Sequence, residues 1–189
     1  MAAVRREQIL DAVDSCLIKH GVAGATVARI AGEAGVQPSI IAHYFGNKDA
    51  VVRLAVERTL GRFRAGFAAA LDGVPAPRQL DALLDVAFDG SMTAPEYGQM
   101  VDLLIADSYY DQATRELVRA LYRDFEVLIE RAVAASHPKL SRTRCRELAY
   151  GLLCLADANN TFGCIGFDAA HHKRARHYAD LLVNALTKP

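Results

Sequence analysis

The chain has 189 residues, of which 52% are hydrophobic and 23% are charged, and its 22 basic residues balance its 22 acidic ones. This composition is typical of a folded protein and excludes a disordered one. Because the net charge is zero, the chain as a whole does not attract nucleic acid, and any DNA binding has to be local. No apolar run reaches the roughly 18 residues that a membrane helix needs, and the N-terminus lacks an apolar signal region, so we expect neither membrane insertion nor export.

The four cysteines lie within helical patterns and form no CxxC pair. This arrangement favours reduced, mostly buried thiols over disulfides and predicts a cytoplasmic protein. The cysteines are Cys16, Cys145, Cys154 and Cys164.

Apolar residues recur with a helical period almost throughout the chain, without an alternating strand pattern or an internal repeat. Gly21 is expected to end the first helix, and Thr26, Asn47 and Ser141 are suitable N-caps for later ones. The sequence DGVPAP at 72–77 is the clearest break. In chain order, the predicted helices cover residues 4–20, 27–34, 38–44, 48–71, 80–88, 96–108, 117–132, 141–162 and 169–186. The expected fold is therefore all-α, with about nine helices.

Residues 26–48 (TVARIAGEAGVQPSIIAHYFGNK) have the length and turn chemistry of a helix-turn-helix. The apolar side chains that can pack inward are Ile30, Ala31, Val36, Ile41 and Phe45. The second short helix then presents its other side outward and fits the major groove of DNA, with its N-terminal residues near base edges. We therefore predict base contacts from Gln37, Ser39 and Ile40, and backbone contacts from His43, Tyr44, Lys48 and Thr26.

This module is only weakly basic. Residues 1–48 hold five basic side chains (Arg5, Arg6, Lys19, Arg29, Lys48) and four acidic ones (Glu7, Asp11, Asp14, Glu33), a net charge of +1. Plain packing of His43 and Tyr44, and a solvated Lys48, are the alternatives to DNA contact. A lysine at a helix N-terminus opposes the helix dipole, and this cost favours a phosphate-binding role for Lys48.

The pair Tyr44-Phe45, followed by Lys48 at the start of a long helix, resembles the signature of TetR-type transcriptional regulators. The segment IIAHYFGNKDAVV at 40–52 is most similar to the BetI-like, choline-responsive subgroup. The resemblance covers about residues 5–60, and the C-terminal half is similar in helix count and at 150–157 (YGLLCLAD). Many family members have a DNA-contacting tyrosine where this chain has Ala42, and a Lys-Gly or Thr-Gly pair in place of Pro38-Ser39. Contacts at Ala42 and Pro38 are therefore not carried over.

The resemblance implies a homodimeric repressor that a small molecule releases from operator DNA. It implies a DNA-binding domain at 1–48, a connecting helix at 48–71, and an effector-binding and dimerisation domain at 72–189. By the same architecture, the middle helices line an effector pocket with Phe88, Met92, Tyr97, Leu104, Tyr109, Phe125, Asp157 and Asn160. The last two helices form a four-helix bundle with their counterparts in the partner, through Leu148, Leu152, Leu155, Tyr178, Leu181 and Leu182.

The implied pocket is mostly apolar and aromatic, which favours a largely apolar effector with one or two hydrogen-bonding groups. Choline itself is not carried over, because the chain has no tryptophan to form the best wall of a cation-binding box. Asp157 lies among apolar residues of its helix, and both a structural and a ligand-binding role stay open for it.

The sequence contains no pattern that indicates catalysis, a metal site or a cofactor. His172 and His177 are five residues apart and do not share a helix face, so we interpret the histidines at 171, 172 and 177 as surface residues. No two aspartates are spaced as an acid and base pair. Two alternatives to a regulator stay open, a helical enzyme and a dimeric small-molecule-binding protein without a role on DNA. Steeply salt-dependent DNA binding would argue against the second.

Overall fold

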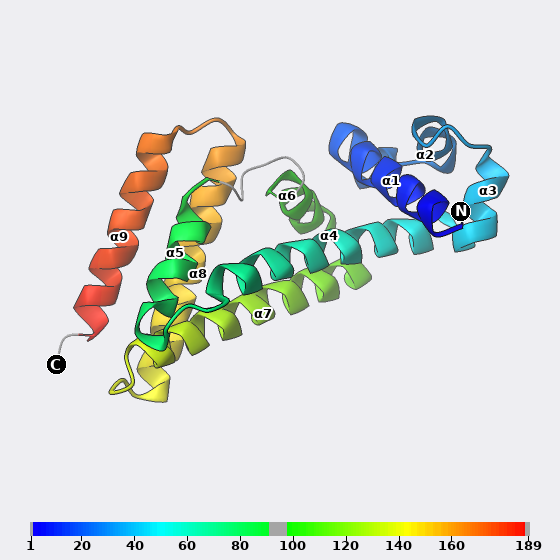
Figure 1. Ribbon diagram of the computed structural model, residues 1–189. Coiled ribbons are helices and arrows are strands. Elements are labelled where there is room, and N and C mark those ends of the chain that lie inside the picture. The colour runs from blue at the N-terminus through cyan, green and yellow to red at the C-terminus, as the bar shows by residue number, and fades with distance from the viewer. Residues whose placement is uncertain (1, 91–97, 188–189) are drawn as a thin grey trace. The chain divides into compact units, whose positions relative to one another are not determined.

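Every regular element of the computed structural model, which describes residues 2–90 and 98–187, is a helix (Figure 1). The helices are α1 (Ala2–Gly24), α2 (Val27–Glu33), α3 (Pro38–Phe45), α4 (Lys48–Leu71), the 3-10 turn η1 (Ala76–Arg78), α5 (Gln79–Phe88), α6 (Gly98–Asp107), α7 (Gln112–Ser136), α8 (Arg142–Cys164) and α9 (Ala169–Thr187). For the described residues, the expectation of an all-α fold is confirmed. Met92, Tyr97 and the predicted start of a helix at 96 lie outside them.

The predicted caps set the helix ends. The side-chain oxygens of Thr26 and Ser141 each accept a hydrogen bond of 3.3 Å from the amide three residues on, and that of Asn47 accepts one of 2.8 Å from Ala50. Gly21 interrupts α1 with a φ of +68°, a conformation that glycine adopts without strain. The regular part of α1 therefore ends after His20, as predicted, and one further turn leads to Gly24.

The described residues form two compact units. The first contains α1, α2, α3, α4 as far as Phe63, α6, and the chain to Arg115. The second contains the rest of α4, α5, α7 from Glu116, α8 and α9. The units differ from the domains expected from the sequence, because α6 belongs with the N-terminal helices. The functional domains at 1–48 and 72–189 stay predictions.

The core of the first unit lies between α1 and the short helices. Ile9, Val13 and Leu17 on one face of α1 are fully buried, and Ile30 and Ile41 are buried from α2 and α3. α6 packs on α1 as well. Burying these aliphatic side chains stabilises the unit by about 1.5–3 kcal/mol each.

The second unit is built on α8, which packs against α9, with α5 packed on both (Figure 1). Its fully buried side chains include Leu83, Leu121, Leu148 and Leu152. Among the described residues, no helix is both long and apolar enough to cross a membrane.

Candidate nucleic-acid interface

The helix-turn-helix packs largely as the sequence predicted, but Val36, in the turn between the two helices, is only partly buried. Ile30, Ala31 and Ile41 are at most 1% exposed, and Phe45 is also buried. The outward side of α3 and its turn carries the predicted DNA-contacting residues. Gln37, Ser39 and His43 are exposed, and Ile40 and Tyr44 are partly exposed.

The turn between α2 and α3 is closed by backbone hydrogen bonds. Gly35 donates to Gly32 at 3.2 Å, and Val36 donates to Ala31 at 2.9 Å. Gly35 has a φ of +63°, which favours glycine at this position. Pro38 then starts α3, where its missing amide proton costs nothing. Gln37 therefore stands directly before the helix, at the end that a recognition helix turns toward bases.

Arg6 fixes the start of α1 to the end of α3. Its guanidinium donates to the backbone oxygen of Tyr44 at 3.3 Å and lies 4.7 Å from the centre of the Phe45 ring. A cation at a helix C-terminus and over an aromatic face is favourable on both counts. The sequence showed Arg6 only as one positive charge, because no local pattern pairs residue 6 with residue 45.

Lys48 and Thr26 already have partners within the protein. The Lys48 ammonium is partly buried and donates to the Val22 oxygen at 3.2 Å, which ties the start of α4 to the last turn of α1. The Thr26 oxygen accepts from the Arg29 amide. Each group keeps donor capacity, because an ammonium has three N–H bonds and a hydroxyl that accepts can still donate. Their DNA contacts stay predictions.

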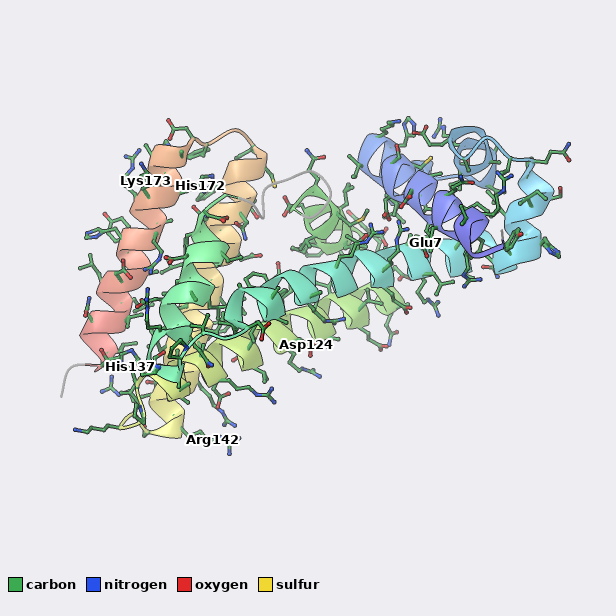
Figure 2. All side chains as sticks on the ribbon, in the orientation of Figure 1. Glu7, Asp124, His137, Arg142, His172 and Lys173 are labelled. Atoms are coloured by element: carbon green, nitrogen blue, oxygen red, sulfur yellow. The ribbon has the colours of Figure 1, made fainter. Side chains whose placement is uncertain are left out.

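Three carboxylates of α1 surround one arginine of α4. The Arg58 guanidinium lies 2.9 Å from oxygens of both Glu7 and Asp11, and it donates to Asp14 (Glu7 is labelled in Figure 2). Burial raises the pKa of Asp14, although the hydrogen bond and charge of Arg58 act to lower it. The spacing of four and three residues between the acids places them on one face of α1, a signal that could have indicated this cluster from the sequence.

The fourth acid of the module is also paired. Glu33 accepts hydrogen bonds from Lys19 at 2.6 Å and Ser15 at 2.7 Å, and these bonds lower the pKa of the carboxyl. Residues 35–48 contain no acidic side chain. The module's negative charges are thus paired on α1 and α2, and the face of α3 carries none. This segregation explains how a chain of zero net charge can present a surface suited to DNA.

Known proteins resemble this chain both in the helix-turn-helix and over most of its length. Residues 9–55 match the family of bacterial regulatory proteins described as the tetR family. The HTH-type transcriptional regulator BetI of Brucella anthropi is 29% identical over 89% of this chain and 86% of that protein. The BetI regulator of Burkholderia mallei is 28% identical over 100% of this chain and 96% of that protein. Over residues 9–55 the chain therefore matches the TetR family, and over most of its length it is similar to BetI regulators. These relatives are named as HTH-type transcriptional regulators, which supports a regulator over a helical enzyme.

Solved structures agree on the TetR fold. A TetR transcription regulator from Haloarcula marismortui superposes with a TM-score of 0.83 at 19% identity, covering 98% of this chain and 100% of that one. A TetR-family regulator from Streptomyces coelicolor gives 0.84 at 20% identity, covering 97% and 96%. These likenesses confirm the predicted architecture of a helix-turn-helix followed by a helical domain.

Half of the predicted dimer residues are turned toward their own chain. Leu148 and Leu152 are completely buried in the core of the second unit, so neither is available to a partner. Leu182 packs against α8 of its own chain. A Cβ atom placed on Gly151 would lie only 3.0 Å from the Leu182 side chain. Leu155 is half-buried. The helical period identified an apolar face, but it did not distinguish a face buried within the chain from one left for a partner.

Other apolar residues of α8 and α9 are exposed. Tyr178 and Leu181, both predicted, are 60% and 49% exposed on α9. On α8, the exposed apolar residues are Tyr150, Cys154, Ala158 and Phe162, at intervals of four residues that keep them on one face.

The predicted pocket residues fall in both units. Leu104 is buried in the first unit, and Tyr109 is 74% exposed there. Phe88 and Phe125 belong to the core of the second unit, where the Phe125 ring lies 5.1 Å from that of Phe67. In the same unit, Asp157 accepts a hydrogen bond from the Tyr122 hydroxyl.

The interpretation of His172 as a surface residue was wrong. Its ring is buried and lies 2.9 Å from the Asn159 side-chain oxygen (His172 is labelled in Figure 2). Within the described residues, the buried amide nitrogen of Asn159 and the buried amide oxygen of Asn160 have no hydrogen-bond partner. The same part of the chain contains no group of three metal-ligating side chains close enough to hold an ion.

Proposed function

We propose that this protein is a TetR-family repressor that binds operator DNA as a homodimer in the cytoplasm and leaves the operator when a small molecule binds. The observation that carries the DNA-binding part is the outward face of α3. It presents Gln37, Ser39 and His43 on a segment without a carboxylate, next to paired acids. A helix that carries no acidic side chain and offers hydrogen-bonding side chains at its N-terminus suits the major groove.

Two kinds of contact follow from the placement of these side chains. Gln37 and Ser39 stand at the start of α3 and are proposed to contact bases, with Ile40 packing on a thymine methyl. His43, Tyr44, Lys48 and Thr26 are proposed to contact the backbone. Lys48→Ala should weaken binding about equally on all sequences, because phosphate contacts position a protein without reading bases.

The dimer is proposed to form through the exposed apolar residues of α8 and α9. Tyr150 and Phe162 on α8, and Tyr178 and Leu181 on α9, are each about half exposed or more. A second copy that packs these side chains in a four-helix bundle would remove them from water. This revised set replaces Leu148, Leu152 and Leu182 as the proposed interface.

The effector is proposed to bind in the second unit, near Asp157 and Asn160. Phe88 and Phe125 supply apolar surface there, and the unpaired oxygen of Asn160 offers an acceptor to a ligand donor. A largely apolar molecule with one or two hydrogen-bonding groups suits this chemistry. A cation would have to compete with the Tyr122 hydroxyl for Asp157. An anion would face the desolvation cost of a buried charge close to a carboxylate.

Release requires a difference in effector affinity between two states of the dimer. An effector that binds the DNA-free state more tightly shifts the population away from the operator-bound one.

The test is a reporter gene under the chain's own upstream DNA, combined with a thermal-shift panel of apolar, cationic and anionic metabolites. Wild-type protein should repress the reporter, and compounds that stabilise the protein should restore expression. Activation of the reporter in place of repression would contradict the repressor role. If only phosphorylated or polycarboxylate compounds stabilise the protein and release DNA, the proposed pocket fails while the DNA-binding role survives.

A further inference from the structure

A hollow of about 250 Å³ opens beside the turn that leads into α3. It joins the start of α1 to the helix-turn-helix, since its lining comes from both. The lining residues are Arg5, Gly35, Val36, Gln37, Ile40 and Tyr44. Gln37 and Tyr44 already belong to the proposed DNA contacts, whereas Arg5 does not.

The chemistry of this lining suits an anion. It contains one full positive charge, on Arg5, and no carboxylate. The Arg5 guanidinium, the Gln37 amide and the Tyr44 hydroxyl can all donate hydrogen bonds. At Gly35 the structure leaves open space where a side-chain carbon would stand, so a bound group can approach the backbone.

Arg5 is more available than the other basic residues of the module. Arg6 is held by Tyr44 and Phe45, and Lys19 is held by Glu33. Arg5 is exposed and donates to the exposed Gln8 side chain at 3.4 Å, a long bond that is easily exchanged for another acceptor.

We propose that Arg5 and Tyr44 together hold one phosphate of the DNA backbone in this hollow. The inference rests on the proposed binding of α3 in the major groove, because the backbone that borders the groove then passes the start of α1. Arg5 donates charge-assisted hydrogen bonds to the phosphate oxygens, and the Tyr44 hydroxyl donates a further one. Gln37, at the same hollow but directly before α3, remains free to reach a base. The contact sets the register of α3 along the groove.

The test measures the affinity of wild type and Arg5→Ala for two duplexes by fluorescence anisotropy, over a series of salt concentrations. One duplex is the operator chosen by selection from random DNA, and the other is a mixed-sequence duplex of the same length. Arg78→Ala, which removes an exposed arginine of η1 in the second unit, is the matched control. Arg5→Lys tests whether charge alone is enough, and Tyr44→Phe is combined with Arg5→Ala in a double-mutant cycle.

Arg5→Ala should weaken binding about tenfold per protomer on both duplexes, because a hydrogen bond to a charged group is worth at least that much. The slope of log K against log salt should become shallower by about 0.9 per protomer. Arg78→Ala should leave the affinity and the salt slope unchanged. Arg5→Lys should recover the slope but only part of the affinity. In the double-mutant cycle, the fold-loss of DNA affinity of the double variant should be smaller than the product of the two single-variant losses, since both side chains hold the same phosphate.

Three results would overturn the proposal. The first is that Arg5→Ala binds DNA as tightly as wild type. The second is that it loses affinity on the operator alone, which would make Arg5 a base-reading residue. The third is that the affinity loss of the double variant equals the product of the losses of Arg5→Ala and Tyr44→Phe. Wild type that binds neither duplex would refute the proposed function itself, and with it this inference. An unchanged thermal midpoint of Arg5→Ala would show that the variant is folded.

Discussion

Arg58→Met should destabilise the protein markedly, because it removes the guanidinium that pairs with three carboxylates of α1. The pairs with Glu7 and Asp11 contribute little, since those side chains are 58% and 65% exposed and surface pairs are worth about 0–1 kcal/mol. Asp14 is different. Its side chain is 19% exposed and that of Arg58 is 13% exposed, and breaking a buried pair costs about 3–5 kcal/mol.

Because Asp14 keeps some contact with water, we expect a loss near the lower limit, about 3 kcal/mol. For a chain of this length, that lowers the thermal midpoint by about 6–12 °C. Urea denaturation and thermal melts at pH 7, at one fixed protein concentration, measure both quantities. Arg62→Met is the control for charge without a direct contact, since Arg62 is exposed one turn further along α4 and its charge also acts on Asp14.

The double variant Arg58→Met with Asp14→Leu should recover most of the loss, because replacing both partners of a buried pair by apolar side chains is often neutral. A loss below about 1 kcal/mol for Arg58→Met would show that the cluster behaves as a surface network. A loss as large for Arg62→Met would show that the effect is one of general charge.

Three further outcomes follow from the same structure. Because burial raises the pKa of Asp14 above its usual 3.8, the native state binds a proton more readily than the unfolded state. The stability of wild type relative to Asp14→Asn should then fall as pH rises from about 3 and level off above the native pKa; a rise in urea titrations would contradict this. Gln37→Ala should reduce the free energy of operator binding by about 1–3 kcal/mol and relax the preference at one base pair. An unchanged base preference in a series of mutated operators would refute the proposed docking of α3. Tyr150→Arg and Leu181→Arg should each weaken dimerisation at least a hundredfold in sedimentation experiments and reduce operator binding in parallel. Unaltered dimers would show that α8 and α9 do not form the interface.

The helix boundaries were predictable because their signals are local. Thr26, Asn47 and Ser141 cap their helices through bonds to amides three residues away, and Gly21 interrupts α1 where its sequence position suggested. The inward and outward sides of the helix-turn-helix followed from a period of 3.6 residues over a very short segment.

The partner that each helix covers was not predictable, because a helical period shows that a face is buried and not what buries it. α6 packs on α1, although their sequences are far apart. In α8, Leu148 and Leu152 belong to the core of the chain itself, and the exposed Tyr150 lies between them on another face of the same helix. Likewise, nothing local links His172 to Asn159, thirteen residues earlier.

DNA binding by α3 of a dimer is tested most directly by selecting DNA sites from a random library with the purified protein and then determining how many protomers bind the selected site. We expect a site with two related half-sites in inverted orientation, bound by two protomers, and with an affinity that falls steeply as salt rises. We also expect Gln37→Ala to select a site altered within the half-sites. No enriched sequence at low salt, or a selected site that Gln37→Ala leaves unchanged, would contradict the claim that α3 of a dimer reads operator DNA.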